Sequence, residues 1–210
     1  MSRKKNKKLH YNEDDERTLG EDILDFVKVF AISAIVILLF VNLVAHPVNV
    51  MGRSMDPTLK DGEYGFTSLI GVDKKNLERG DIVVVTMNDE SGKESHWVKR
   101  IIGLPGETIE AKDGIVYIDG QPLDESAYLI QENIDEILAE YKEQSNGLDY
   151  GPFTFDFGPV TLADDEYWVM GDNRPWSKDS RYPDVGPVHA DQIYGKGILV
   201  LWPFNKIGVK

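Results

Sequence analysis

The sequence predicts a mainly β protein with a single N-terminal transmembrane helix and one further, short amphipathic helix. Three observations indicate this fold class. An apolar run covers residues 26–45. After it, short β-branched runs alternate with Gly- and Pro-containing turns for most of the chain. One later stretch, 130–141, has apolar residues at helical spacing.

Composition limits the size and the partners of the protein. The 210 residues, 41% of them hydrophobic, are enough for one membrane segment and one domain of about 165 residues. The formal charge of −13 argues against nucleic acid as a partner. The chain has no cysteine, which excludes disulfides and thiolate chemistry, and its four histidines lack the spacing of a helical metal pair. We therefore expect no metal site.

The first 45 residues read as a tail and a membrane anchor. Residues 1–25 hold a basic block and an acidic block without apolar periodicity, which predicts a solvated tail. As a helix, residues 26–45 would be roughly 30 Å long, enough to cross a bilayer. Six Lys and Arg precede this run and two occur in the twenty residues after it. The positive-inside rule thus places the tail in the cytoplasm and a domain over 46–210 outside. A cleaved signal peptide is the alternative, but the long leading segment favours an uncleaved anchor.

Beyond His46-Pro47, which should end the helix, the elements follow from turn residues and periodicity. A turn is predicted at 88–93. Apolar residues on one face predict a helix over 128–146, and its acidic residues are expected to form a solvated face. The predicted strands are 82–86, 96–102, a hairpin over 108–120, 167–170 and 193–204.

Ser54 is the first candidate for chemistry. It lies in Val-Met-Gly-Arg-Ser-Met-Asp-Pro-Thr-Leu, residues 50–59, where Pro57 restricts the backbone and should present the hydroxyl on a constrained, non-helical segment. This is a suitable setting for a nucleophile. A simple turn serine is the alternative.

Lys99 is the candidate base. On a strand it shares a face with Trp97 and Ile101. If that face is buried, loss of hydration lowers the pKa of the amine towards the range of a general base. His96 points to the opposite face and is a poorer partner for Ser54. A lysine that reaches the surface along its alkyl chain is the alternative.

A polar loop at 171–181 follows the strand 167–170. Ser177 could orient Lys99 by a hydrogen bond, and two ion pairs, Asp172 with Arg100 and Asp179 with Arg181, could make the loop rigid. In a Ser/Lys dyad, the backbone N–H of Ser54 would face the developing oxyanion.

Four motifs resemble those of bacterial type I signal peptidases, peptidase family S26, of the Gram-positive type. They are Gly-Arg-Ser-Met-Asp-Pro-Thr-Leu (52–59), Arg-Gly-Asp-Ile-Val (79–83), Val-Lys-Arg-Ile-Ile-Gly-Leu-Pro-Gly-Glu (98–107) and Gly-Asp-Asn-Arg-Pro-Trp-Ser-Lys-Asp-Ser-Arg (171–181). The resemblance covers about residues 25–204. It implies an anchored, all-β catalytic domain outside the cytoplasmic membrane that removes signal peptides from exported preproteins.

The resemblance also implies site residues. Ser54 matches the family nucleophile and Lys99 its general base. Supporting positions are matched by Ser177, Asp172, Asp179, Arg181 and Arg100. Gly52 falls where some members carry a serine that helps the oxyanion hole, so the Ser54 amide is the donor expected here. Pro175-Trp176 departs from the polar pair often found there, and should alter loop packing but not the reaction.

The implied reaction is cleavage after small residues, of the Ala-x-Ala type, without a metal or other cofactor. Trp97 and Met55 are expected at the substrate-binding site, with Trp97 as a wall of a small pocket. Met55, together with the 202–204 segment, is also expected to contact the lipid bilayer. Three alternatives remain: a pilus-processing peptidase, the self-cleaving domain of SOS-response repressors, and an anchored domain that binds exported peptides without cutting them. The anchor and the complete 171–181 loop favour the signal peptidase.

Overall fold

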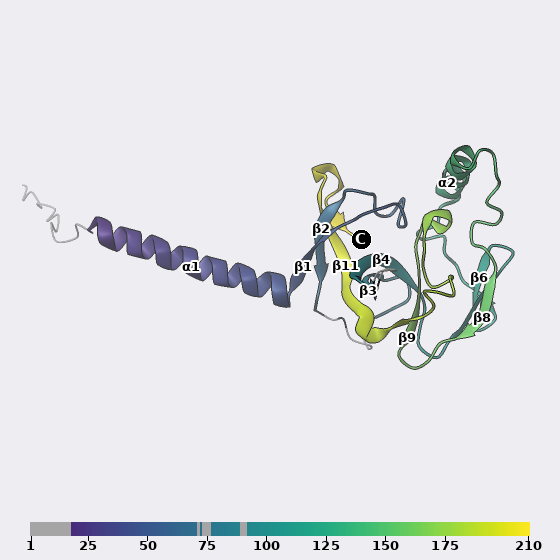
Figure 1. Cartoon of the computed structure of the whole chain (residues 1–210), viewed down its shortest axis with the longest axis horizontal. Helices are drawn as coiled ribbons and strands as arrows, with labels where there is room; N and C mark the ends of the chain where they lie inside the picture. The colour runs from purple at the N-terminus through teal and green to yellow at the C-terminus, as the bar shows by residue number, and fades with distance from the viewer. Residues whose placement is uncertain (1–17, 71, 73–76, 89–91) are drawn as a thin grey trace, which may run out of the picture. The chain divides into compact units, whose positions relative to one another are not determined.

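The computed structural model describes residues 18–70, 72, 77–88 and 92–210 (Figure 1). Most of the predicted N-terminal tail and the centre of the predicted turn at 88–93 lie outside these residues. The chain divides into two compact units, Met1–Phe40 and Val41–Lys210. The first contains most of the N-terminal helix, and the second contains all the strands.

Helix α1, Leu19–Leu43, is apolar and exposed along almost its whole length. It is long and apolar enough to cross a membrane. The helix begins before the apolar run 26–45 that was predicted as the membrane span, and it ends at Leu43. Thr18 and Glu21 form a capping box, in which the Thr18 amide donates to Glu21 Oε2 at 2.9 Å, and this starts the helix at Leu19. His46 and Pro47 do not end the helix, because both already belong to the first strand.

The larger sheet has eight strands, all of whose pairs are antiparallel. Its order is β1-β2-β11-β3-β4-β9-β10, with β12 paired to β11. The register sets Lys99 of β4 opposite Val83 of β3, and Arg100 opposite Met170 at the end of β9. The 171–181 loop therefore begins beside Lys99 and Arg100. The strands are β1 Ala45–Asn49, β2 Tyr64–Ser68, β3 Ile82–Asn88, β4 Glu94–Gly103, β9 Glu166–Met170, β10 Val188–His189, β11 Ile193–Trp202 and β12 Gly208–Val209.

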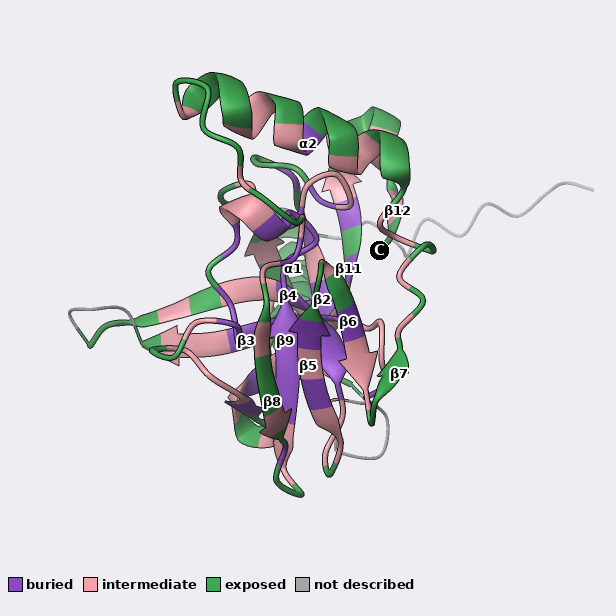
Figure 2. Cartoon of the chain, turned by 90° about the vertical axis from the view of Figure 1, so that its right-hand side faces the viewer, coloured by how far each residue is buried: buried purple, intermediate pink, exposed green. Residues whose placement is uncertain are grey.

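The smaller sheet has the order β7-β6-β5-β8. Its strands are β5 Thr108–Lys112, β6 Ile115–Ile118, β7 Gln121–Pro122 and β8 Phe157–Thr161. The predicted hairpin turn is present, with Asp113 and Gly114 both at positive φ. Buried side chains of β4 and β9 pack against those of β5 and β6, including Ile102, Met170, Ile109 and Val116. One core thus joins the two sheets (Figure 2).

All predicted strands and the second helix are confirmed. Helix α2, Gln131–Gln144, is amphipathic, and its one buried residue is Ile137. Figure 2 shows that most of its surface is exposed. Three 3₁₀ turns complete the fold: η1 Arg174–Trp176, η2 Ala190–Gln192 and η3 Phe204–Lys206. The protein is therefore mainly β, as predicted.

Candidate active site

Ser54 lies in the loop between β1 and β2. On its C-terminal side, Met55 and Leu59 are 1% and 0% exposed and pack into a core with Val50. On its N-terminal side, Gly52 has φ +83°, which favours glycine, and its amide donates to Asp61 Oδ1 at 2.7 Å. The loop is thus anchored at both ends, with the half-buried Ser54 between them.

The burial of Met55 corrects one expectation. A side chain that is 1% exposed cannot reach a lipid surface, so Met55 is an anchor of the loop. Its apolar side chain lies under the loop because this position faces the core beside Leu59. Trp202 and Phe204, by contrast, are 53% and 72% exposed.

Lys99 is buried, with 4% of its surface exposed. Burial lowers the pKa of its amine to about 8; the negative charges of Asp179 and Asp172 oppose the shift, and the positive charge of Arg181 adds to it. Its Nζ lies 5.6 Å from the centroid of the Trp97 ring. The sequence-based condition for a lowered pKa, a buried face, is therefore met.

A cleft of about 450 Å³ contains both Ser54 and Lys99 in its lining. Trp97, Met55 and Val84 also line it. Strand β1 forms one wall of the cleft, and this was not predicted, because a five-residue strand directly after the anchor is too short to show a periodicity. At this wall, Tyr194 packs edge-on against His46 and stacks on His96, with centroid distances of 5.2 and 4.9 Å.

The 171–181 loop brings Ser177 to the same region. A Cβ on Gly171 would lie 2.3 Å from both the Ser54 carbonyl oxygen and Ser177 Oγ, so only glycine allows this approach. The Asn173 amide donates to the Ser54 carbonyl at 3.0 Å. Ser177 is 2% exposed, and its hydroxyl makes no hydrogen bond of regular geometry within the described part of the chain. Its expected hydrogen bond to Lys99 therefore stays a prediction.

Both expected ion pairs are present. Arg181 donates from Nε to Asp179 Oδ1 at 2.7 Å and from its terminal nitrogen to Oδ2 at 2.9 Å, and both side chains are fully buried. Burial alone would raise the pKa of the Asp179 carboxyl, but the hydrogen bonds and charge of Arg181 outweigh it and lower that pKa. Asp179 also accepts the Gly171 amide at 2.9 Å. The pair therefore holds both ends of the loop.

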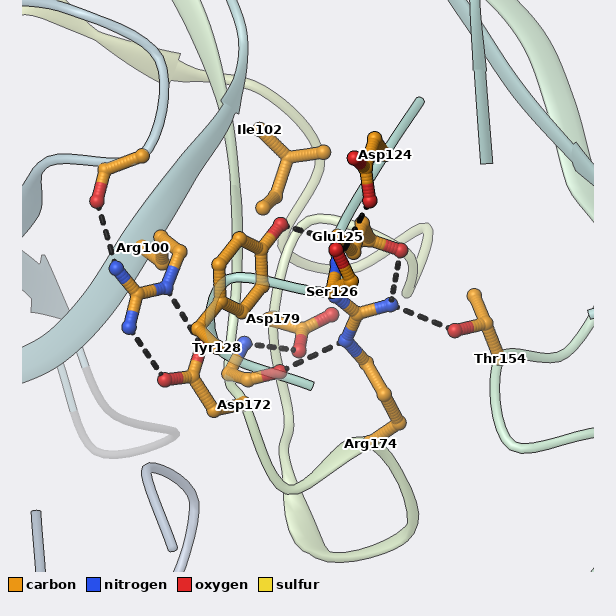
Figure 3. Close-up of polar contacts among 12 residues, drawn as sticks. Arg100, Ile102, Asp124, Glu125, Ser126, Tyr128, Thr154, Asp172, Arg174 and Asp179 are labelled. Carbon is orange, nitrogen blue, oxygen red and sulfur yellow. Dashed lines mark hydrogen bonds and ion pairs between the residues drawn. The ribbon is translucent and has the colours of Figure 1, made fainter. Parts of the chain in front are cut away.

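The second pair links β4 to two loops. Arg100 donates to both oxygens of Asp172, at 2.8 and 2.6 Å, and to the Gly80 carbonyl at 2.7 Å (Figure 3). Asp172 also accepts the Thr58 hydroxyl at 2.5 Å. Since Thr58 follows Ser54 in the same loop, this network ties the serine loop to the strand that carries Lys99. The guanidinium of Arg100 stacks on Tyr128, 4.2 Å from the ring centroid.

The contacts of a third buried arginine, Arg174, were not predicted. Arg174 is 0% exposed and pairs with Glu125 at 2.5 Å and with the Thr154 hydroxyl at 2.6 Å (Figure 3). Its Nε donates to the Gly171 carbonyl at 3.0 Å. The motif contained Arg174, but Glu125 and Thr154 lie in segments without any recognisable pattern. Sequence spacing could not have joined these three residues.

Two backbone amides could face a developing oxyanion. The Gly52 amide is already bonded to Asp61, whereas the Ser54 amide donates to no other group among the described residues.

In the described part of the chain, no group of three or more His, Asp or Glu side chains is placed to hold a metal ion.

Comparisons with known proteins agree on one family. The family model described as signal peptidase, peptidase S26, matches residues 23–202. Signal peptidase I S of Bacillus subtilis (strain 168) is 38% identical over 187 residues, which are 89% of this chain and 93% of that protein. Signal peptidase IB of Staphylococcus aureus (strain COL) is 33% identical over 196 residues, 90% of this chain and 94% of the relative.

A crystal structure of a signal peptidase I from Enterococcus faecalis V583 is 33% identical and covers 57% of this chain and 94% of its own, with a TM-score of 0.40. The family model and the Bacillus and Staphylococcus relatives each extend over most of the chain. The chain therefore belongs to the signal peptidase family, peptidase S26, and is a serine endopeptidase that processes signal peptides.

Proposed function

We propose that this peptidase cleaves preproteins after small residues at Ala-x-Ala sites, with Ser54 as nucleophile and Lys99 as general base. One observation carries the proposal: a buried amine with a lowered pKa lines the same cleft as a half-buried serine hydroxyl. The supporting roles belong to Ser177, to the Asp172–Arg100 pair and to the Asp179–Arg181 pair.

The lowered pKa decides whether Lys99 can act as a base. At pH 7, an amine with a pKa of about 8 is neutral in roughly one molecule in ten, whereas an ordinary lysine is neutral in about one in 3,000. Burial therefore raises the neutral fraction by about 300-fold. Asp179 and Asp172 do not cancel this effect, because each is paired with its own arginine.

The reaction then has two stages. Neutral Lys99 takes the proton of the Ser54 hydroxyl as Oγ bonds to the scissile carbonyl carbon, and the carbonyl oxygen becomes an oxyanion beside the Ser54 amide. When the C–N bond breaks, the Lys99 ammonium returns the proton to the leaving amine, and an ester remains on Ser54. In the second stage, Lys99 takes a proton from water as the water oxygen attacks the ester carbonyl. The bond to Ser54 Oγ then breaks, the Lys99 ammonium returns the proton to Oγ, and the signal peptide leaves with a free carboxylate.

The cleft supports the preference for small residues. Its lining is largely apolar, with Trp97 and Val84 among the wall residues, and Met55 is fixed in the core beneath the Ser54 loop. A small, apolar side chain next to the scissile bond would pack against these apolar walls and lose its contact with water.

The membrane arrangement belongs to the same proposal. Residues 1–25 form a cytoplasmic tail, the span corresponds to 26–45 within and just beyond the apolar helix, and 46–210 form the extracytoplasmic peptidase domain. The charge difference across the apolar run supports this orientation in the cell membrane. The exposed Trp202 and Phe204 would contact the bilayer.

The test is cleavage of a preprotein with an Ala-x-Ala site by the full chain in detergent or liposomes, with the new N-terminus identified by sequencing. We expect a single cut after the second alanine, and no cut when that alanine is replaced by leucine. Ser54→Ala should be inactive while still binding the preprotein. Cleavage at other positions, or unchanged activity in Ser54→Ala, would contradict the proposal.

A further inference from the structure

We propose that Arg53 is a positioning residue for Ser54, and that helix α2 supplies part of the catalytic machinery by holding it. This inference rests on the proposed role of Ser54. It gives α2, which has no assigned role, a function through Glu140 and Tyr141. We call Arg53, Glu140, Trp176 and Tyr141 the α2 clamp.

The guanidinium of Arg53 contacts helix α2, its own loop and the 171–181 loop. Its guanidinium is paired with Glu140 of α2 through one terminal nitrogen, and with Asp56 Oδ2 through Nε at 3.4 Å. Its Cζ lies 5.4 Å from the ring centroid of Trp176, so the cation also faces an aromatic ring. The residue directly before Ser54 is therefore fixed by partners far away in the sequence.

Trp176 connects helix α2 to the residue that is proposed to orient Lys99. It directly precedes Ser177, the residue proposed to orient Lys99, and its ring lies 5.6 Å from the ring of Tyr141 in α2. Tyr141 in turn packs edge-on against Tyr150 at 5.0 Å. One turn of α2 thus contacts the neighbours of both Ser54 and Ser177.

The backbone of the serine loop explains why this contact matters. On the N-terminal side of Ser54, Gly52 has no side chain and is exposed, so among the described residues it is held only by the hydrogen bond from its amide to Asp61 Oδ1. On the C-terminal side, Met55 is locked in the core. Arg53 is therefore the side chain that can fix the N-terminal side of the nucleophile.

The α2 clamp is expected to contribute little to the free energy of unfolding of the domain. The side chains of Arg53 and Glu140 are 34% and 41% exposed, and ion pairs at such positions contribute little to the free energy of unfolding. A small displacement of a nucleophile, by contrast, strongly slows a reaction that depends on its alignment. We therefore expect loss of the pair to affect turnover more than folding.

The experiment measures kcat and KM for cleavage of an Ala-x-Ala preprotein by the full chain, with the melting temperature of each variant. Glu140→Gln should lower kcat by about tenfold, leave KM within about twofold and change the melting temperature by less than about 3 °C. The matched control is Glu136→Gln, an exposed glutamate one turn earlier on the same helix, which should behave as the wild type.

A double variant tests whether the two residues act as a unit. Arg53→Gln should lower kcat at least as much as Glu140→Gln, and adding Glu140→Gln to it should cause no further loss, because the shared interaction is already gone. Adding Glu136→Gln should also change nothing.

Three results would overturn the inference: an unchanged kcat in Glu140→Gln, a fall in kcat that follows a matching fall in melting temperature, or multiplied losses in the double variant. These results leave the proposed function standing, provided that the wild type cleaves. A folded wild type that does not cleave would refute both the clamp and the function on which it rests.

Discussion

Lys99→Met should lower kcat/KM for preprotein cleavage by at least about 10³-fold and at the same time make the protein more stable. Activity falls because, among the described residues, the other lysine that lines the cleft, Lys178, is exposed, so burial does not favour the neutral form of its amine. Stability rises because the buried lysine has a pKa of about 8 in the folded protein against 10.5 for an ordinary lysine. The unfolded chain binds more protons between these values, so at pH 7 the lysine costs about 3 kcal/mol, which methionine removes.

The measurements are cleavage kinetics and thermal unfolding of the same preparation. Lys112→Met is a suitable control, since Lys112 is exposed on the β5–β6 hairpin. It should leave both quantities almost unchanged. An active Lys99→Met protein would show that the base is elsewhere, and an unfolded one would show that the lysine is needed for the fold.

Arg181→Met should destabilise the domain by about 3–5 kcal/mol, the largest stability effect expected for a single substitution here. Asp179 is 0% exposed, and without Arg181 its carboxylate would be buried without the cation that is directly paired with it. Arg181 also donates to the Arg174 carbonyl at 2.8 Å, so the loop would lose a backbone contact as well. Chemical denaturation of wild type and variant measures the difference.

The double variant Asp179→Asn with Arg181→Met separates charge from packing. Asparagine carries no charge, and its side-chain oxygen can still accept the Gly171 amide. We therefore expect the double variant to recover much of the lost stability but not the activity, because the charges around Lys99 have changed. A double variant as unstable as Arg181→Met would mean that the unpaired carboxylate is not the cause.

The sequence predicted six of the strands, β3, β4, β5, β6, β9 and β11, and two ion pairs beside the candidate site, because these depend on local patterns; the short strands β1, β2, β7, β8, β10 and β12 were missed. Alternation places Lys99 on one face of a strand, and opposite charges beside a rigid loop are expected to pair, as Asp179 and Arg181 do. The resemblance to the family motifs led to the expectation that Ser54, Lys99 and Ser177 lie in one site. No local pattern could have placed Ser54 and Lys99 in one cleft, since that depends on the order of strands in the sheet.

The missed features depend on long-range contacts or on side-chain direction. Glu125 with Arg174 and Glu140 with Arg53 pair across loops whose paths no periodicity reveals. Met55 was expected at the lipid surface because preproteins in the membrane would be cleaved beside the bilayer, but the loop turns the Met55 side chain into the core. The start of α1 could have been read from the sequence, since Thr18 and Glu21 have capping-box spacing.

The central claim is that neutral Lys99 activates Ser54, and the pH dependence of kcat/KM for wild-type cleavage tests it most directly. Only the neutral amine is active, so kcat/KM should rise about tenfold per pH unit below the pKa and level off above about pH 8. If kcat/KM instead levelled off above about pH 6.5, the ordinary range of histidine, the claim would be contradicted. The base would then be a histidine, such as His96 in the lining of the cleft.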